Sequence, residues 1–262
     1  MKKFWLIAVI ILCIATVLGG KIYWNHKIGR ISSSNLQSGI NTSSGVASDF
    51  SLDGSSATIN KQISALPKSL QKAASSARKN NGQVQIAMVG SENVQALSLL
   101  LQHQLDLTFG DLFFKVTAID LGQINSLNLN QAKTTDLFKN MSARPDAVIF
   151  TPLLYNDNGK VGSGDTETVT GLFEEKIRLQ YPKAAFFISL PNYSSDAPYI
   201  NSRIDSLEAY VTDQKFQNLN YLSKWPKGNT RANLVSSDGH TMNKAGQTVW
   251  INYVISQWGL KK

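Results

Sequence analysis

Residues 83–107 read QVQIAMVGSENVQALSLLLQHQLDL. The first seven form a short apolar run with β-branched side chains, which is typical of a buried strand. Residues 93–107 carry a helical pattern, and only the polar turn Gly90-Ser91-Glu92-Asn93 separates the two segments. A buried strand that leads directly into a helix predicts the first half of a βαβ unit.

Similar segments follow along the chain. We predict further strands over 113–121, 146–152 and 184–191, with a weaker one near 217–222. Helices are expected over about 166–180, 200–213 and 242–258, whereas residues 124–140 are helical or irregular. Strands that alternate with helices form parallel sheets covered on both faces. The sequence therefore predicts one α/β domain, a three-layer α/β/α sandwich, over residues 82–262.

The N-terminal segment has a different character. Residues 4–20, FWLIAVIILCIATVLGG, form an unbroken apolar run behind Lys2 and Lys3. About 17 apolar residues are just enough to span a bilayer as a helix. Residues 1–24 are therefore predicted as a transmembrane anchor that leaves the rest of the chain outside the cytoplasm, and a cleaved signal peptide is the alternative. The single cysteine, Cys13, lies in this run, which excludes a cysteine-rich metal site.

Two segments connect the anchor to the domain. Residues 25–57 are rich in Ser, Gly and Asn and have few large apolar side chains, so they predict a flexible linker. Residues 58–81 carry a helical pattern that Pro67 interrupts, which predicts a helical lead-in.

The net charge of +8 favours an anionic partner. The basic residues are scattered, without an arginine-rich stripe, so nucleic acid is not predicted as a partner. For an exported chain, the anionic cell wall or membrane surface is the expected counterpart. The alternative is that the charge serves solubility alone.

Chemistry is expected at the carboxyl ends of the strands, because ligands of open parallel sheets bind there. Ser91 follows the first strand, Gly122 the second and Asn156 the third, while Asp238 and His240 precede the last helix. A hydroxyl, backbone and amide N–H donors, and an imidazole with an acid are the groups that a hydrolase needs. Of the three histidines, His26 is juxtamembrane and His103 lies within a predicted helix, so His240 is the candidate base.

Each of these residues also has a structural interpretation. Ser91 is a suitable N-cap for the following helix. Asn156-Asp157-Asn158-Gly159 and Asp238-Gly239 are ordinary turn sequences, and Thr241 is a candidate cap for the last helix.

The order and spacing of four segments resemble the SGNH, or GDSL-type, hydrolases. That family has Gly-Asp-Ser after the first strand, Gly after the second, Gly-x-Asn-Asp after the third and Asp-x-x-His before the final helix. The corresponding segments of this chain, within residues 82–262, are VQIAMVGSE, AIDLGQ, AVIFTPLLYNDNG and SDGHTMNKAG. The resemblance implies a flavodoxin-like sandwich and ester hydrolysis. It also implies that Ser91 attacks, His240 is the base, Asp238 orients it, and Gly122 and Asn156 hold the oxyanion.

The chain departs from this pattern at three places, one of which is Leu154 at the glycine position of the third block. Aligning Gly90 with the family's glycine puts Ser91 at the aspartate position and Glu92 at the nucleophile position. Aligning Asp238 with the family's last block puts Thr241 at the histidine position, with His240 one residue earlier.

Three functional hypotheses follow. The first is a membrane-tethered, extracytoplasmic esterase that acts on glycan or lipid esters of the cell envelope, without a cofactor or metal. The second is an inactive domain of the same fold that binds an anionic wall polymer or a protein partner. The third is an unrelated α/β binding module, which the absence of a glycine-rich phosphate loop disfavours. The sequence leaves the oligomeric state open.

Overall fold

The computed structural model describes residues 53–260. Its centre is a parallel sheet of five strands in the order β2-β1-β3-β4-β5. The strands are β1 Val84–Gly90, β2 Phe114–Asp120, β3 Ala147–Phe150, β4 Ala185–Ile188 and β5 Gln217–Asn218. The order reverses between β1 and β3, as in flavodoxin-like folds, and confirms the predicted α/β class.

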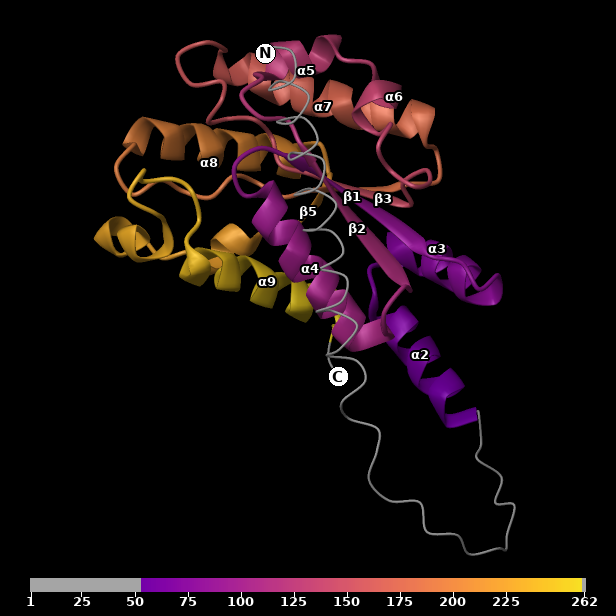
Figure 1. Ribbon diagram of the computed structural model, residues 1–262. Helices are drawn as coiled ribbons and strands as arrows, with labels where there is room; N and C mark the ends of the chain where they lie inside the picture. The colour runs from indigo at the N-terminus through magenta and orange to yellow at the C-terminus, as the bar shows by residue number, and fades with distance from the viewer. Residues whose placement is uncertain (1–52, 261–262) are drawn as a thin grey trace, which may run out of the picture. The chain divides into compact units, whose positions relative to one another are not determined.

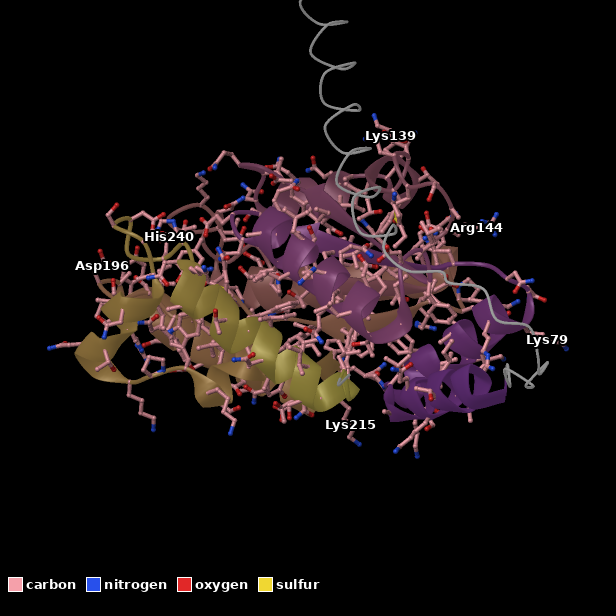
Figure 2. All side chains as sticks on the ribbon, turned by 60° about the horizontal axis from the view of Figure 1, so that its bottom comes forward. Lys79, Lys139, Arg144, Asp196, Lys215 and His240 are labelled. Carbon is pink, nitrogen blue, oxygen red and sulfur yellow. The ribbon has the colours of Figure 1, made fainter. Side chains whose placement is uncertain are left out.

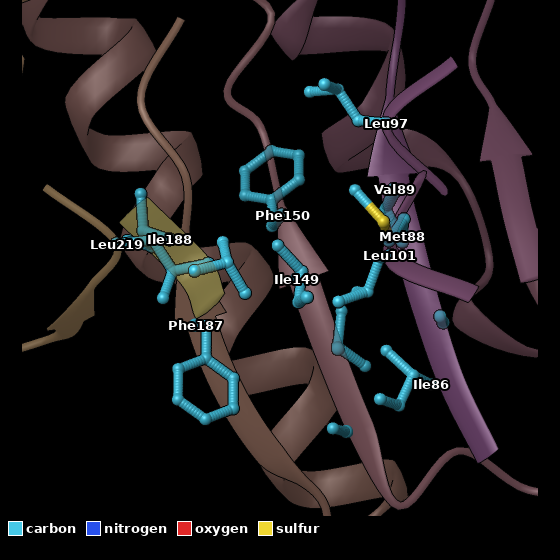
Figure 3. Packing of buried hydrophobic residues seen from close by; sticks show 14 of the residues in the cluster. Ile86, Met88, Val89, Leu97, Leu101, Ile149, Phe150, Phe187, Ile188 and Leu219 are labelled. Carbon is cyan, nitrogen blue, oxygen red and sulfur yellow. The ribbon is translucent and has the colours of Figure 1, made fainter. Parts of the chain in front are cut away.

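Strand β1 lies in the middle of the sheet and explains why its sequence is almost continuously apolar. It pairs with β2 from Val84↔Phe114 to Gly90↔Asp120 and with β3 from Ile86↔Ala147. All seven of its residues are buried, because helices cover both faces. Figure 3 shows side chains of β1, β3 and β4 packed against those of the helix that follows β1.

Helices cover the sheet on both sides and complete the three layers (Figure 1). One side carries α4 Val94–Phe109 and α9 Lys244–Trp258, which pack against each other. The other side carries α5 Ser126–Gln131, α6 Thr134–Leu137, α7 Ser163–Gln180 and α8 Pro198–Asp213. Trp250, Val254 and Trp258 lie four residues apart on α9 and are fully buried, so this stripe attaches the C-terminal helix to the core.

Two helices precede the sheet, α2 Asp53–Ala65 and α3 Lys68–Lys79. They are separated next to Pro67, as the sequence predicts. Ile63, Leu66, Leu70 and Ala74 belong to the same hydrophobic core as the sheet. Helix α2 begins at Asp53, within the range predicted as linker, because its apolar residues give it a surface on which to pack.

Several boundaries differ from the prediction. Residues 124–140, predicted as helical or irregular, contain the two short helices α5 and α6 and agree with the prediction. The predicted fifth strand is only two residues long, after which the chain turns into the 3-10 helix η1 Tyr221–Lys224. A second 3-10 helix, η2 Gly228–Leu234, has no apolar periodicity and was not predicted.

Within the described residues, none of the helices combines the length and apolar character needed to cross a bilayer. The predicted anchor at 1–24, with Cys13, and most of the predicted linker at 25–57 lie outside those residues.

Candidate active site

The turn after β1 brings a charged side chain to the carboxyl end of the sheet. Gly90 passes close to β3, since a Cβ there would lie 3.1 Å from Thr151 Cβ. Glu92 adopts a left-handed backbone conformation, with φ 45°. The amide of Val94 then donates to the carbonyl of Ser91, and α4 begins.

The loop before α9 is organised by Asp238. Its Oδ1 accepts the backbone N–H of His240 at 3.0 Å and that of Thr241 at 2.9 Å. The bridge between Val235 and Met242 closes the base of the loop. The Asp238 carboxylate therefore shapes the loop that carries His240, rather than contacting the imidazole at hydrogen-bond distance: its Oδ1 lies 3.9 Å from Nδ1.

The imidazole of His240 is held on both nitrogens. Nδ1 lies 2.9 Å from the backbone oxygen of Asp238, and Nε2 lies 3.2 Å from Glu92 Oε1. A carbonyl oxygen only accepts, so we assign a proton to Nδ1. Nε2 then faces the Glu92 carboxylate at hydrogen-bond distance. Tyr155 stacks on the ring at 4.8 Å between centroids, and we call Glu92 and His240 the Glu–His pair.

The electrostatics of the two acids differ. Burial raises the pKa of Glu92; His240 opposes this shift, whereas the negative charge of Asp238 adds to it. For Asp238, burial acts in the same upward direction. The hydrogen bonds from Thr241 and His240 outweigh it and lower the pKa to about 2. Asp238 is therefore ionised near neutral pH. Glu92 has the higher pKa of the two and keeps its proton to higher pH.

Two asparagines that the sequence analysis did not single out position the pair. Asn192, almost fully buried, donates to the backbone oxygen of His240 at 2.7 Å. Asn93 donates to Asn192 Oδ1 at 3.1 Å and accepts from the amide of Met242 at 2.9 Å. The Tyr155 hydroxyl donates to the Asn192 carbonyl at 2.7 Å. Asn192 follows the predicted strand 184–191 directly, so inspecting that strand end would have found it.

Ser91 lies beside the pair and has a different partner. Its hydroxyl is 3.5 Å from Asn156 Oδ1, while the two imidazole nitrogens of His240 contact Glu92 and Asp238. Glu92 therefore occupies the place opposite His240 that the sequence analysis gave to Ser91. The role of Ser91 as nucleophile stays a prediction.

The two predicted oxyanion donors already have acceptors within the chain. The amide of Gly122 donates to Asp120 Oδ1 at 2.8 Å. Asn156 Nδ2 donates to the backbone oxygens of Gly122 at 2.8 Å and Ile124 at 2.7 Å. Asn156 thus ties the loop after β3 to the loop after β2. An oxyanion would have to compete with these acceptors for the N–H groups of Gly122 and Asn156.

The neighbouring Asp157 is fully buried and has a structural role. Its carboxylate accepts the amide and hydroxyl of Ser126 and the hydroxyl of Thr166, all within 2.7 Å. It therefore fixes the beginnings of α5 and α7, which explains physically why an acid follows Asn156.

A cleft of about 410 Å³ opens over the Glu–His pair. Figure 2 shows His240 and Asp196 together at one end of the domain, away from Lys79, Lys139, Arg144 and Lys215. The lining of the cleft is mostly polar. Only two of its lining residues are aliphatic, Ala197 and Ile200. The polar and aromatic residues include Glu92, Tyr155, Asn156, Asn158, Lys160, Ser194, Asp196, Tyr199 and His240.

No family model matches the sequence, and no curated protein matches it either. Solved structures do match. A carbohydrate esterase of family 3 from Talaromyces cellulolyticus is 12% identical with a TM-score of 0.54, over 69% of this chain and 100% of that one. The lipase/acylhydrolase from Enterococcus faecalis is 12% identical with a TM-score of 0.53, over 69% and 98%. A GDSL-like lipase from Bacteroides thetaiotaomicron is 15% identical with a TM-score of 0.50, over 76% and 98%.

The likeness covers nearly all of each of these neighbours, at identities that establish the fold alone. The described domain thus has the fold of the GDSL-type lipases and esterases, and the resemblance stated from the sequence is confirmed at the level of fold.

Proposed function

We propose that this domain hydrolyses acyl esters of the cell envelope, with its chain held at the outer face of the membrane by residues 1–24. The Glu–His pair in its cleft is the observation that carries the proposal, because it provides acid–base groups at the carboxyl end of a parallel sheet. The neighbours of the same fold named as lipases and esterases support it.

The cleft favours esters on sugars over esters with long acyl chains. Tyr199 is 56% exposed, and its hydroxyl accepts a hydrogen bond from Asn158 Nδ2 at 2.7 Å. An exposed aromatic ring among carboxamides suits a sugar, which presents both hydroxyls and apolar ring faces. A long acyl chain would find few aliphatic side chains here.

The sequence supports the location. An apolar run at 4–20 behind two lysines, followed by a segment rich in Ser, Gly and Asn, is the arrangement of a tethered extracytoplasmic domain. Envelope glycans and lipids are the esters within reach of such a domain.

The test uses the full-length chain in detergent, with 4-nitrophenyl acetate and an acetylated glycan fragment as substrates and a long-chain ester for comparison. We expect turnover of the acetyl esters and a loss of about 100-fold or more in His240→Ala. His103→Ala is the matched control, since His103 is an exposed residue of α4. Absence of turnover by the wild-type chain on all three esters would contradict the proposal.

Two observations favour a second candidate function, a non-catalytic domain that binds anionic wall polymer or a protein. Gly122 and Asn156 both donate to acceptors of the chain itself, and Glu92 stands where the family has its serine. This candidate predicts salt-sensitive binding to wall material and no labelling by a fluorophosphonate probe. Covalent labelling at Ser91 would exclude it.

A further inference from the structure

We propose that Glu92 is the acid–base group that activates water in this site, in place of a serine nucleophile. The inference rests on the proposed ester hydrolysis and assigns its chemistry to a particular side chain. It predicts hydrolysis in one displacement by water, without a covalent acyl-enzyme.

The orientation of the Glu92 carboxylate is the first argument. Its side chain lines the cleft and is 20% exposed, so substrate and water can reach it. Oε1 contacts His240 Nε2 at 3.2 Å, and across residues 53–260 no other donor contacts this carboxylate. Oε2 is therefore available to accept a hydrogen bond from a water molecule in the cleft.

The second argument is that His240 has no nitrogen left for this task. Nδ1 is engaged with the Asp238 carbonyl and Nε2 with Glu92. A histidine that acts as base needs one unprotonated nitrogen directed at the nucleophile. In this geometry the imidazole positions the carboxylate, and the base of the pair is Glu92.

The third argument concerns Ser91. The Ser91 hydroxyl donates to Asn156 Oδ1 at 3.5 Å. This carboxamide oxygen accepts a hydrogen bond but is far too weak a base to take the hydroxyl proton, so it does not activate Ser91 as a nucleophile. Glu92 is held in a left-handed conformation, φ 45°, in the turn that projects its side chain toward His240. Unfavourable backbone conformations of this kind are concentrated at functional sites.

The reaction balances with water as the only co-reactant. Glu92 Oε2 takes a proton from water while the water oxygen forms a bond to the acyl carbon. As the tetrahedral intermediate collapses, the bond between the acyl carbon and the alcohol oxygen breaks, and that oxygen takes the proton from Glu92. A carboxylic acid and an alcohol leave, and the Glu–His pair has regained its original protonation state. The groups that face Glu92 during these steps are His240, Asp238 and Tyr155.

The experiment compares full-length wild type, Glu92→Gln and Glu175→Gln on 4-nitrophenyl acetate. Glu92→Gln keeps the shape of the side chain and removes the base, so we expect a loss of about 100-fold or more in kcat. Glu175→Gln, on the exposed side of α7, is the matched control and is expected to keep wild-type activity. The melting temperatures of the three proteins are measured to check that both variants fold.

A second measurement needs no variant. Wild-type protein is acid-quenched during turnover and its intact mass and peptides are examined; we expect no acyl adduct. An acyl group on Ser91, or retained turnover in Glu92→Gln, overturns the assignment to Glu92 and leaves ester hydrolysis standing. A wild-type chain without esterase activity overturns the proposed function and this assignment together.

Discussion

Glu92 has a backbone conformation that suits glycine better than glutamate. At φ 45° the Cβ of an ordinary residue crowds the neighbouring carbonyl, which costs about 1–2 kcal/mol. Glycine has no Cβ and escapes that cost. Two variants that both lack the Glu92 carboxylate separate the effect of this backbone conformation on stability from the effect of the carboxylate on catalysis.

We predict that Glu92→Gly is more stable than Glu92→Ala by about 1 kcal/mol, although glycine is ordinarily the less stabilising of the two. Both variants lose the contact with His240, so the difference reports on the backbone alone. Urea unfolding monitored by tryptophan fluorescence measures it. Equal stabilities, or a more stable alanine variant, would show that the turn does not hold the left-handed conformation.

In the proposed reaction, the charge next to Glu92 influences the pH at which hydrolysis begins. A base must be deprotonated, so kcat/KM on an acetyl ester is expected to rise with pH through the pKa of Glu92. Burial raises that pKa, His240 opposes the shift, and the negative charge of Asp238 adds to it. Asp238→Asn removes one of the raising contributions and retains an oxygen that accepts the two backbone N–H groups.

We therefore predict that Asp238→Asn moves the acid limb of the pH–rate profile to lower pH. Asp213→Asn, at the exposed C-terminal end of α8, serves as the control and leaves the profile unchanged. A shift of the acid limb to higher pH in Asp238→Asn would argue that another group limits the rate.

At the scale of elements, the beginning of α9 determines where His240 lies. Asn243, rather than Thr241, is the N-cap: its Oδ1 accepts the amides of Ala245 at 2.8 Å and Gly246 at 3.1 Å. Gly246 allows the helix to pass close to η2, because a Cβ there would lie 2.3 Å from the carbonyl oxygen of Leu234. The Asn and Gly of SDGHTMNKAG are thus explained by a cap and a close approach.

We predict that Gly246→Ala lowers both thermal stability and esterase activity, because the added methyl forces apart α9 and the end of η2, from which the chain continues into the His240 loop. A loss of about 1–3 kcal/mol is typical of overpacking. Gly164→Ala is the matched control: it is also in the first turn of a helix, α7, and a Cβ there meets nothing within 4 Å. Calorimetry and the acetyl ester assay measure both effects. Equal behaviour of the two variants would contradict the close approach.

The strands and helices could largely be predicted from the sequence, whereas the side-chain contacts in the candidate site could not. Strands such as β1, β3 and β4 are buried on both faces, so their apolar runs are visible in the sequence. The residues that meet at the strand ends were also predicted in part, including His240. Which of two neighbours, Ser91 or Glu92, faces His240 depends on the left-handed turn at Glu92, and propensities for glutamate give no sign of it.

At the scale of the whole molecule, the proposed tether predicts where the protein is found. In fractionated cells that produce the full chain, we expect it in the membrane pellet after a carbonate wash. The domain should be degraded by protease added from outside. Release of a shortened soluble chain would support the cleaved signal peptide instead. Protection from external protease would contradict export of the domain.

The Glu–His pair joins the beginning of the sheet to the end of the chain. The contact between Asn93 and Met242 that supports it spans 149 residues of sequence. A chain still being synthesised or translocated has the first half of its site long before the second. The Glu–His pair therefore forms only after the last helix has docked. If the domain is the proposed esterase, a C-terminal truncation that removes α9 is expected to abolish its activity.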